Sequence, residues 1–225
     1  MKTETMILTA LFLMLFFVFP VNAQLSIGAK VGLNFATISE SDDLGGDFKI
    51  RLGLNLGAIA EYAVMDPLGI QIEFLIDQFG AVYKEKGTFD WGSIDEKTKV
   101  RANVLSIPIM AKYTHPLDEQ MTLYGLLGPN LGLLLFGKAK GEEKVWDVKI
   151  DEPITDTCKR FDLGVVLGAG VQMPFNNYNV FVDLRYILGL TNDFKKGGYL
   201  GDGDFVFKNR VLSLNFGIRG LLNFE

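Results

Sequence analysis

The sequence predicts an all-β fold, an eight-stranded antiparallel up-and-down β-barrel that crosses a membrane. Three observations predict it. Apolar residues alternate with glycine or polar residues in eight successive segments, and a period of two is the period of a β-strand. The charged residues inside those segments fall on the less apolar of the two rows. The connections between the segments alternate between short and long, as in barrels whose strands run up and down across an outer membrane.

The beginning of the chain is expected to be a signal peptide and not part of the fold. An apolar run, almost uninterrupted, covers Ile7–Phe19, and Pro20 ends it. Val21–Ala23 then supplies the small-residue pattern that precedes a cleavage site. The run is too short to cross a bilayer comfortably as a helix. We therefore divide the chain into a cleavable signal peptide, residues 1–23, and a barrel domain, residues 24–225.

The first three expected strands show the alternation in its plainest form. An apolar residue occupies every second position, and glycine, asparagine or a charged residue occupies most positions between. Each row of such a strand faces one side of the sheet. The apolar rows begin at Ile27 in Ser26–Ile38, at Ile50 in Lys49–Val64 and at Ile70 in Leu68–Lys84.

The fourth expected strand, Lys99–Thr114, changes phase near its middle. Its apolar residues occupy even positions as far as Val104 and odd positions from Leu105 onward. One extra residue in the strand, a β-bulge near Val104, is the simplest explanation. Pro108 cannot donate a ladder hydrogen bond, so it can share in this irregularity.

The last four expected strands alternate without such a slip. They are longer than most strands of soluble sheets, and they suit a tilted strand that needs about 9–11 residues to cross a bilayer. The apolar rows begin at Leu123 in Met121–Gly137, at Leu163 in Phe161–Met173, at Val180 in Asn179–Thr191 and at Leu212 in Val211–Phe224.

The connections separate the two ends of the expected barrel. Those after the second, fourth and sixth strands are short, and the others are longer and acidic, which places the longer ones on the extracellular side. Lipid cannot satisfy a free sheet edge, so the first strand must pair with the eighth. The longer connections are Ser39–Phe48, Glu85–Thr98, Lys138–Arg160 and Asn192–Asn209.

The charged side chains within the strands decide which row faces lipid. A charged residue on the lipid face would cost about 2–4 kcal/mol near the bilayer centre, whereas charges of opposite sign can pair inside a narrow lumen. A soluble ligand-binding barrel has the opposite arrangement, with an apolar interior, and is kept as a minor alternative. The expected ion-pair network of the lumen consists of Lys30, Arg51, Glu61, Glu73, Lys112, Asp183, Arg185 and Arg219.

Short motifs along the whole mature chain carry a family resemblance. They are Gly28–Asn34, Leu105–Pro108, Leu127–Gly132, Phe161–Gly170, Val182–Tyr186 with Gly189–Asn192, and Asn209–Leu214. In order and spacing they resemble the PorT-like outer-membrane β-barrel proteins, also called porin-family proteins. The resemblance implies a place in the outer membrane of a Gram-negative cell, with membrane lipid and the barrel assembly machinery as partners. It implies no single activity, and the name-giving member serves in protein secretion.

The small size of the barrel bounds its function. Eight strands leave room inside for side chains and little else. We therefore expect a plugged lumen and a structural or interaction role through the extracellular loops, with an unknown extracellular or periplasmic protein as a possible partner. A narrow porin-like channel or an accessory of transport or secretion is the alternative. Trp146, in the longest connection, can contact such a partner or can anchor in lipid headgroups, and both interpretations stay open.

Several classes of function find no support in the sequence. The single histidine, His115, falls in a short turn away from any evident serine, so we expect no Ser–His–acid hydrolase and no enzyme. Cys158 is the only cysteine, which excludes an intrachain disulfide and a thiolate cluster, and we take it as an incidental loop residue. No cofactor or metal site is expected, because the acidic loop residues do not match a calcium-binding loop. A formal charge of -5 without a basic run argues against nucleic acid.

Overall fold

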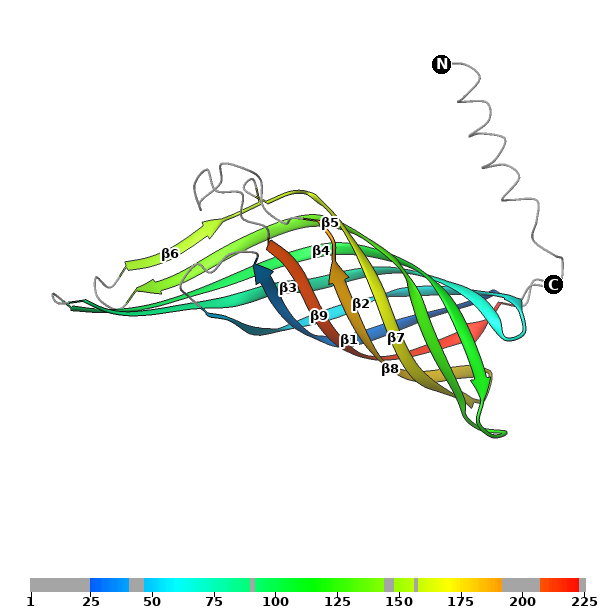
Figure 1. Ribbon diagram of the computed structural model, residues 1–225. Helices are drawn as coiled ribbons and strands as arrows, with labels where there is room; N and C mark the ends of the chain where they lie inside the picture. Colours follow the sequence, from blue (N-terminus) through cyan, green and yellow to red (C-terminus); the bar gives the residue numbers. More distant parts are fainter. Residues whose placement is uncertain are drawn as a thin grey trace, which may run out of the picture.

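A computed structural model shows a single antiparallel sheet that closes on itself into a barrel (Figure 1). The structure describes residues 25–40, 47–89, 92–143, 148–155, 158–191 and 207–222. No helix in these ranges is long and apolar enough to cross a membrane. The strands are β1 (Leu25–Glu40), β2 (Asp47–Met65), β3 (Leu68–Phe89), β4 (Gly92–Pro116), β5 (Thr122–Glu143), β6 (Val148–Pro153), β7 (Phe161–Phe175), β8 (Tyr178–Gly189) and β9 (Phe207–Leu221).

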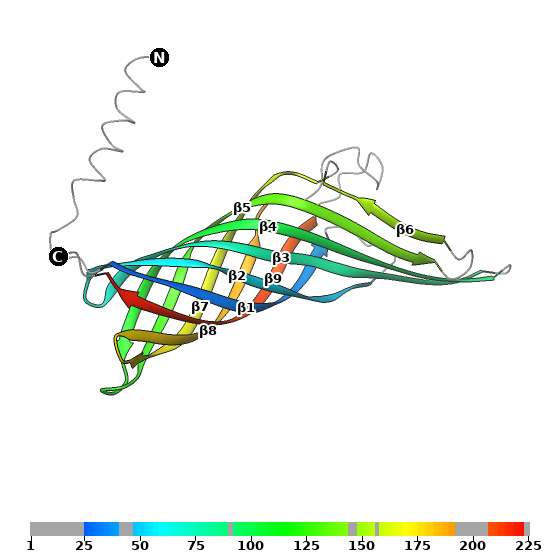
Figure 2. The same cartoon turned by 180° about the vertical axis from the view of Figure 1, so that it is seen from behind.

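Eight of these strands form the barrel wall, so the predicted fold class is confirmed. The order around the sheet is β4-β3-β2-β1-β9-β8-β7-β5, and a further pairing of β4 with β5 closes the ring. The first strand pairs with the last over its whole length, from Ser26 opposite Leu221 to Glu40 opposite Phe207. The wall therefore has no open edge in the part that must lie in lipid, where an unpaired backbone would be costly. Figure 2 shows the closed wall from behind.

The register of the fourth strand shifts near Val104, as predicted, but the bulge lies in the neighbouring strand β5 and not in β4 itself. Asn103 pairs with Phe136, whereas the next residue, Val104, pairs with Leu134, so β5 contributes one residue more than β4 across this step. Both Asn103 and Val104 are buried. β4 itself keeps one phase, because its pairing with β3 continues through this region without a shift. The apolar residues change parity because Val100, Ala102 and Val104 pack inside the barrel, whereas those from Leu105 onward face outward.

Three tight connections lie together at one end of the barrel. Asp66-Pro67 joins β2 to β3, and Asn176-Asn177 joins β7 to β8. Asn176 adopts a φ of 54°, a left-handed conformation that asparagine tolerates in such hairpin turns. In the turn between β4 and β5, the carboxylate of Asp118 accepts hydrogen bonds from the backbone N–H groups of Gln120 and Met121. In barrels of the outer membrane, this short-turn end faces the periplasm.

The opposite end differs from the sequence-based expectation. Two of the expected connections, Glu85–Thr98 and Lys138–Arg160, are largely strand, because β3 pairs with β4 as far as Phe89 opposite Gly92 and β5 continues to pair with β6. These extensions project beyond the barrel (Figure 1). Their charged residues occupy both rows, so the alternation that marks a half-apolar strand is missing there. The backbone ladder forms nonetheless, because its hydrogen bonds do not depend on an apolar face.

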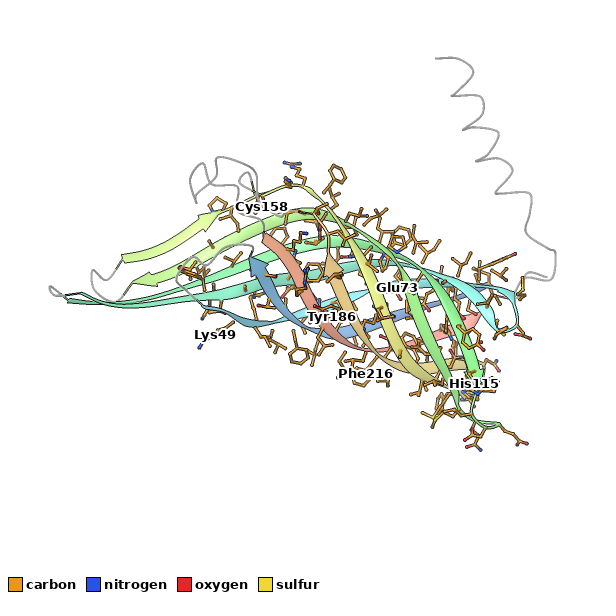
Figure 3. The ribbon with its side chains drawn as sticks, viewed as in Figure 1. Lys49, Glu73, His115, Cys158, Tyr186 and Phe216 are labelled. Carbon is orange, nitrogen blue, oxygen red and sulfur yellow. The ribbon has the colours of Figure 1, made fainter. Side chains whose placement is uncertain are left out.

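The two faces of the wall have opposite chemistry. Leu54, Leu131 and Leu184, from three different strands, are 54%, 47% and 51% exposed on the outer face. The largest side chains that are almost fully buried include Lys112 and Glu73, which point inward. Figure 3 shows Tyr186 and Phe216 on the outside, Glu73 within the wall and His115 at the short-turn end. A soluble ligand-binding barrel would have the reverse arrangement, so that alternative does not fit.

Candidate functional site in the barrel lumen

Glycines on the inward row make room for large polar side chains in the lumen. Gly170 of β7 faces Asp183 and the Tyr124 ring so closely that a Cβ atom there would lie 2.5 Å from Asp183 Cβ and 2.7 Å from Tyr124 Cζ. Gly168 likewise faces the Arg185 side chain, with 2.9 Å from a Cβ to Arg185 Cγ. These glycines therefore make room for large polar side chains of the adjacent strands β5 and β8 to lean over β7 inside the barrel.

The middle of the lumen holds a set of residues that we call the central layer: Lys30, Glu73, Tyr124, Asp183 and Arg185. They come from β1, β3, β5 and β8, which are alternate strands around the ring. Arg185 Nη1 lies 2.8 Å from Glu73 Oε2, and Lys30 Nζ lies 2.8 Å from the same oxygen. Arg185 also donates from Nε and Nη2 to the two oxygens of Asp183, each at 2.7 Å. The guanidinium thus bridges two carboxylates on opposite walls, since β3 and β8 are four strands apart in either direction.

Every carboxylate oxygen of the central layer has at least two hydrogen-bond donors. Tyr124 Oη donates to Asp183 Oδ2 over 2.9 Å, and Asn215 Nδ2 donates to Asp183 Oδ1 over 2.8 Å. The amide of Gln71 donates to Glu73 Oε1. Two cations therefore face two carboxylates, and the lone pairs that burial would leave without water are satisfied.

A second layer, which we call the turn-side ring, crosses the lumen closer to the short turns. It contains Glu61, Lys112, Gln172 and Arg219, from the other set of alternate strands, β2, β4, β7 and β9. Lys112 Nζ lies 2.9 Å from Glu61 Oε2 and 2.8 Å from Gln172 Oε1. The guanidinium of Arg219 contacts the same two residues, Glu61 by an ion pair and Gln172 by a hydrogen bond. Each residue of the ring therefore touches both of its neighbours around the barrel.

Aromatic rings lie against the two cations of the turn-side ring. Lys112 Nζ lies 4.2 Å from the centroid of the Tyr124 ring, and Arg219 Cζ lies 5.9 Å from the centroid of Phe181. Both distances are within the range of cation–π attraction. Ile59, Met110, Leu126 and Val166 pack with these two rings as a buried apolar cluster.

Small polar residues fill the lumen on the outward side of the central layer. Asn34 Nδ2 donates to Asp77 Oδ1 over 2.9 Å, and Asn55 Nδ2 donates to Asn34 Oδ1 over the same distance. Asn55 also donates to Ser213 Oγ at 3.1 Å. Asp77 can only accept when ionised, so it fixes the direction of both amides.

An apolar layer covers these polar residues toward the outward end. Its buried members are Ala36, Phe79, Val104, Leu134, Ile154, Cys158 and Val211. A cavity of about 50 Å³ borders it, far smaller than the pockets of about 300–1,000 Å³ that hold organic ligands. Cys158 lies in the connection between β6 and β7, as expected of a loop residue, but it is only 8% exposed and packs in this layer.

The structure brings most of the candidate residues together in two groups. Lys30, Glu73, Asp183 and Arg185 meet in the central layer, and Glu61, Lys112 and Arg219 meet in the turn-side ring. Arg51 stands apart, because it donates a hydrogen bond to a backbone group, the Phe79 carbonyl oxygen, at 2.9 Å. Trp146 and the expected signal peptide lie outside the described residues.

Other functional side chains were not singled out from the sequence. Asp77, Tyr124 and Gln172 share the inward row with the charged candidates, and this shared parity was the signal that could have found them. His115 lies at the end of β4 and is exposed, at the short-turn end of the barrel as expected.

Solved outer-membrane barrels share this overall arrangement at low sequence identity. A major outer membrane protein of Thermus thermophilus is 17% identical, with a TM-score of 0.48, and the match covers 89% of this chain and 100% of that one. OprG of Pseudomonas aeruginosa is 12% identical, with a TM-score of 0.48 and coverages of 90% and 96%. Neisserial surface protein A is 16% identical, with a TM-score of 0.43 and coverages of 86% and 96%.

The family of the chain is identified by comparison of its sequence with known proteins and protein families. No curated protein matches the chain significantly. The model of the outer membrane protein beta-barrel domain, however, matches residues 21–195, well over half of the chain. This match agrees with the closed wall, the apolar outer face and the charged lumen. The chain therefore belongs to the outer membrane protein beta-barrel domain family, and it is a β-barrel protein of the cell outer membrane.

Proposed function

We propose that this barrel has a plugged lumen and acts through its outward end, as a structural or interaction protein of the outer membrane. The observation that carries the proposal is the Arg185–Glu73 ion pair, which spans the barrel between opposite walls. A conducting pore needs a continuous path for water and ions. Here Arg185 and Glu73 are 2% and 0% exposed, and the turn-side ring lies beneath them.

The stacking of the layers supports the same proposal. The central layer and the turn-side ring use alternate sets of strands, so each fills the gaps that the other leaves. Layers built in this way pack the interior of small closed barrels. The apolar layer around Phe79 and Leu134 adds a third barrier on the outward side.

Conductance measurements in planar lipid bilayers test the plugged lumen. The purified protein should show no steady conductance above the bare membrane. The double variant Glu73→Ala/Arg185→Ala removes the cross-lumen pair but keeps Lys30 and Asp183 as one cation and one anion, so it should conduct if it assembles. A steady, large conductance of the unaltered protein would contradict the proposal and favour a narrow porin-like channel.

The outward extension supports the interaction role. The paired ends of β3, β4, β5 and β6 project beyond the barrel on one side and offer a surface outside the lipid (Figures 1 and 2). The connection that holds Trp146 joins β5 to β6 at the end of this extension. A tryptophan in the connection between two such strands is suited to anchor a partner protein.

Crosslinking in living cells tests this role. A photoreactive amino acid in place of Trp146 should give a reproducible adduct with one protein, and the same substitution at the lipid-facing Leu54 is the matched control. Adducts with lipid alone at both positions would contradict the interaction role while leaving the plugged lumen intact. A secretion component captured at position 146 would support a kinship with PorT-like barrels and would favour a role as an accessory of secretion.

A further inference from the structure

The outward half of the lumen contains a group of oxygen atoms that we call the polar chamber. Its side chains are at most 3% exposed and come from β1, β2, β3, β4, β5 and β9. They lie between the central layer and the apolar outward layer. The members of the polar chamber are Asn34, Asn55, Asp77, Ser106, Asn130 and Ser213.

Asp77 is a buried carboxylate without a cationic partner among the described residues. Its Oδ1 atom accepts from Asn34, and the Ser106 hydroxyl is its other neighbouring donor, so that no charged group pairs with Oδ2 there. Lys30, the lumen cation of the neighbouring layer, is held by Glu73 at 2.8 Å. The carboxylate is therefore surrounded by neutral amides and hydroxyl groups, while Lys30 acts on it only from a distance and is shared with Glu73, so its burial is costly unless something neutralises it.

Two further oxygen atoms of the polar chamber, Asn55 Oδ1 and Asn130 Oδ1, lack a hydrogen-bond partner among the residues that the structure describes. The Ser106 hydroxyl lies beside Asp77, to which it can donate, and its lone pairs have no other donor there. Rotation of the Asn55 amide cannot remove the deficit, because Asn34 donates to Asp77 and so presents its own oxygen to the Asn55 N–H group. The Asn55 oxygen must therefore stay an acceptor.

The strand register places these oxygen atoms along one wall of the lumen. Asn55 lies directly opposite Asp77 in the pairing of β2 with β3. Ser106 is a diagonal neighbour of Asp77, because it pairs with Leu75 and both face inward. Asn130 is in turn a diagonal neighbour of Ser106, which pairs with Gly132. Diagonal neighbours of a sheet stand about 7–8 Å apart at Cα, close enough for the side chains of each neighbouring pair to reach one ion, with Asp77 and Ser106 at the middle of the series.

We propose that the polar chamber binds one small hard cation, with Asp77 Oδ2 as its charged ligand and the oxygen atoms of Asn55, Ser106 and Asn130 as further ligands. Carboxylate, amide and hydroxyl oxygens are the ligands that such cations take. Sodium is the expected ion, because one positive charge neutralises the single carboxylate. Calcium would bind weakly, because its affinity depends on the number of charged ligands.

This site differs from a protein cage of several acidic residues. The described residues hold no group of three or more His, Cys, Asp or Glu side chains that could bind a metal. The proposal therefore rests on unpartnered neutral oxygens beside one carboxylate, and it does not depend on what the outward end of the barrel binds.

Refolding in different salts tests the cation site. The protein is refolded from urea into detergent micelles in sodium chloride, calcium chloride or choline chloride at equal ionic strength, so that no ion has to pass a packed lumen. Choline is too large for the chamber. The apparent melting temperature should be higher in sodium chloride than in choline chloride by ~2–4 °C. A rise in calcium chloride alone would also support a cation site but would identify a divalent ion.

Two variants make the result specific. Asp77→Asn should abolish the difference between salts, whereas Asp162→Asn, which removes a half-buried carboxylate near the outward rim, should keep it. Ser106→Ala removes one neutral ligand, so it should raise the half-maximal sodium concentration about 3–10-fold even if Asp77→Asn does not fold. Equal melting temperatures in all salts would overturn the proposal, and so would an undiminished sodium response in both Asp77→Asn and Ser106→Ala. A protonated Asp77 or trapped water would then explain how the buried oxygens are satisfied.

Discussion

The central layer and the turn-side ring both hold charged side chains inside the barrel, but they differ in their balance of positive and negative charges. In the central layer, Lys30 and Arg185 face Glu73 and Asp183, so cations and anions are equal in number. In the turn-side ring, Lys112 and Arg219 share one carboxylate, that of Glu61, and a neutral amide replaces the second anion. The carboxylate of Glu61 is also 14% exposed, whereas that of Glu73 is 0% exposed.

The two layers should therefore differ in how well they tolerate an extra charge or the loss of a charged side chain. The balanced layer lies in the middle of the barrel, where water cannot compensate a missing partner. The unbalanced ring lies nearer the short turns, where water and the rings of Tyr124 and Phe181 can attenuate one extra positive charge. Loss of a charge should therefore be costly in the first layer and mild in the second.

Removal of Glu73 is the strongest test of this comparison. In Glu73→Ala, Lys30 and Arg185 keep only Asp183, and an uncompensated positive charge stays buried. The free energy of unfolding should fall by about 3–5 kcal/mol, the usual cost of breaking a buried pair. Urea titration of the protein in lipid vesicles measures it, and Glu119→Gln, in an exposed turn, is the control. A loss as small as that of the control would show that the central layer does not hold the barrel together.

Removal of Glu61 should have a smaller effect. Glu61→Gln leaves Lys112 and Arg219 without their carboxylate, but the amide oxygen still accepts a hydrogen bond and water reaches this position. We expect a loss of about 1–3 kcal/mol in the same titration. The loss should also depend on salt more than that of Glu73→Ala, because partly exposed charges are screened. If both losses were equal at low and high salt, the two layers would not differ in their access to solvent.

Removal of a single lysine from each layer gives the finest contrast. Lys112→Met leaves Arg219 and Glu61 as a matched pair, so stability should change by less than about 1 kcal/mol. Lys30→Met leaves the central layer with two carboxylates and one guanidinium, so its loss should be larger. The two methionine variants are matched in size and chemistry, and their urea midpoints can be compared directly. A more harmful Lys112→Met would reverse the comparison.

Much of the wall could be predicted from the sequence, because the relevant signal is local. Alternation over ten or more residues marks each membrane-crossing strand. The change of parity near Val104 was misleading, because it reflects apolar residues inside the barrel, and the bulge itself lies in β5. The separate strand β6 could not be found in this way. It is only six residues long, and its sequence, Val148–Pro153, mixes charged and apolar residues without a clear row.

The contacts inside the lumen were less accessible from the sequence. Parity places Glu73 and Arg185 on the inward row, but 112 positions separate them, and only the register around the ring brings them together. Arg51 has the same parity and yet contacts the backbone of β3, because it lies nearer the outward end. The polar chamber gave no signal of its own, since single asparagine and serine residues do not stand out among glycines.

The seam between β1 and β9 has a consequence for biogenesis. Its two strands stand at the two extremes of the described chain, so the wall cannot be completed until the last hairpin has been exported. Before that moment, both seam strands expose unpaired backbone groups along their length, which invites premature association with other chains. The polypeptide must therefore be shielded from other chains until it reaches the membrane. Its insertion must end with the pairing of its first and last strands.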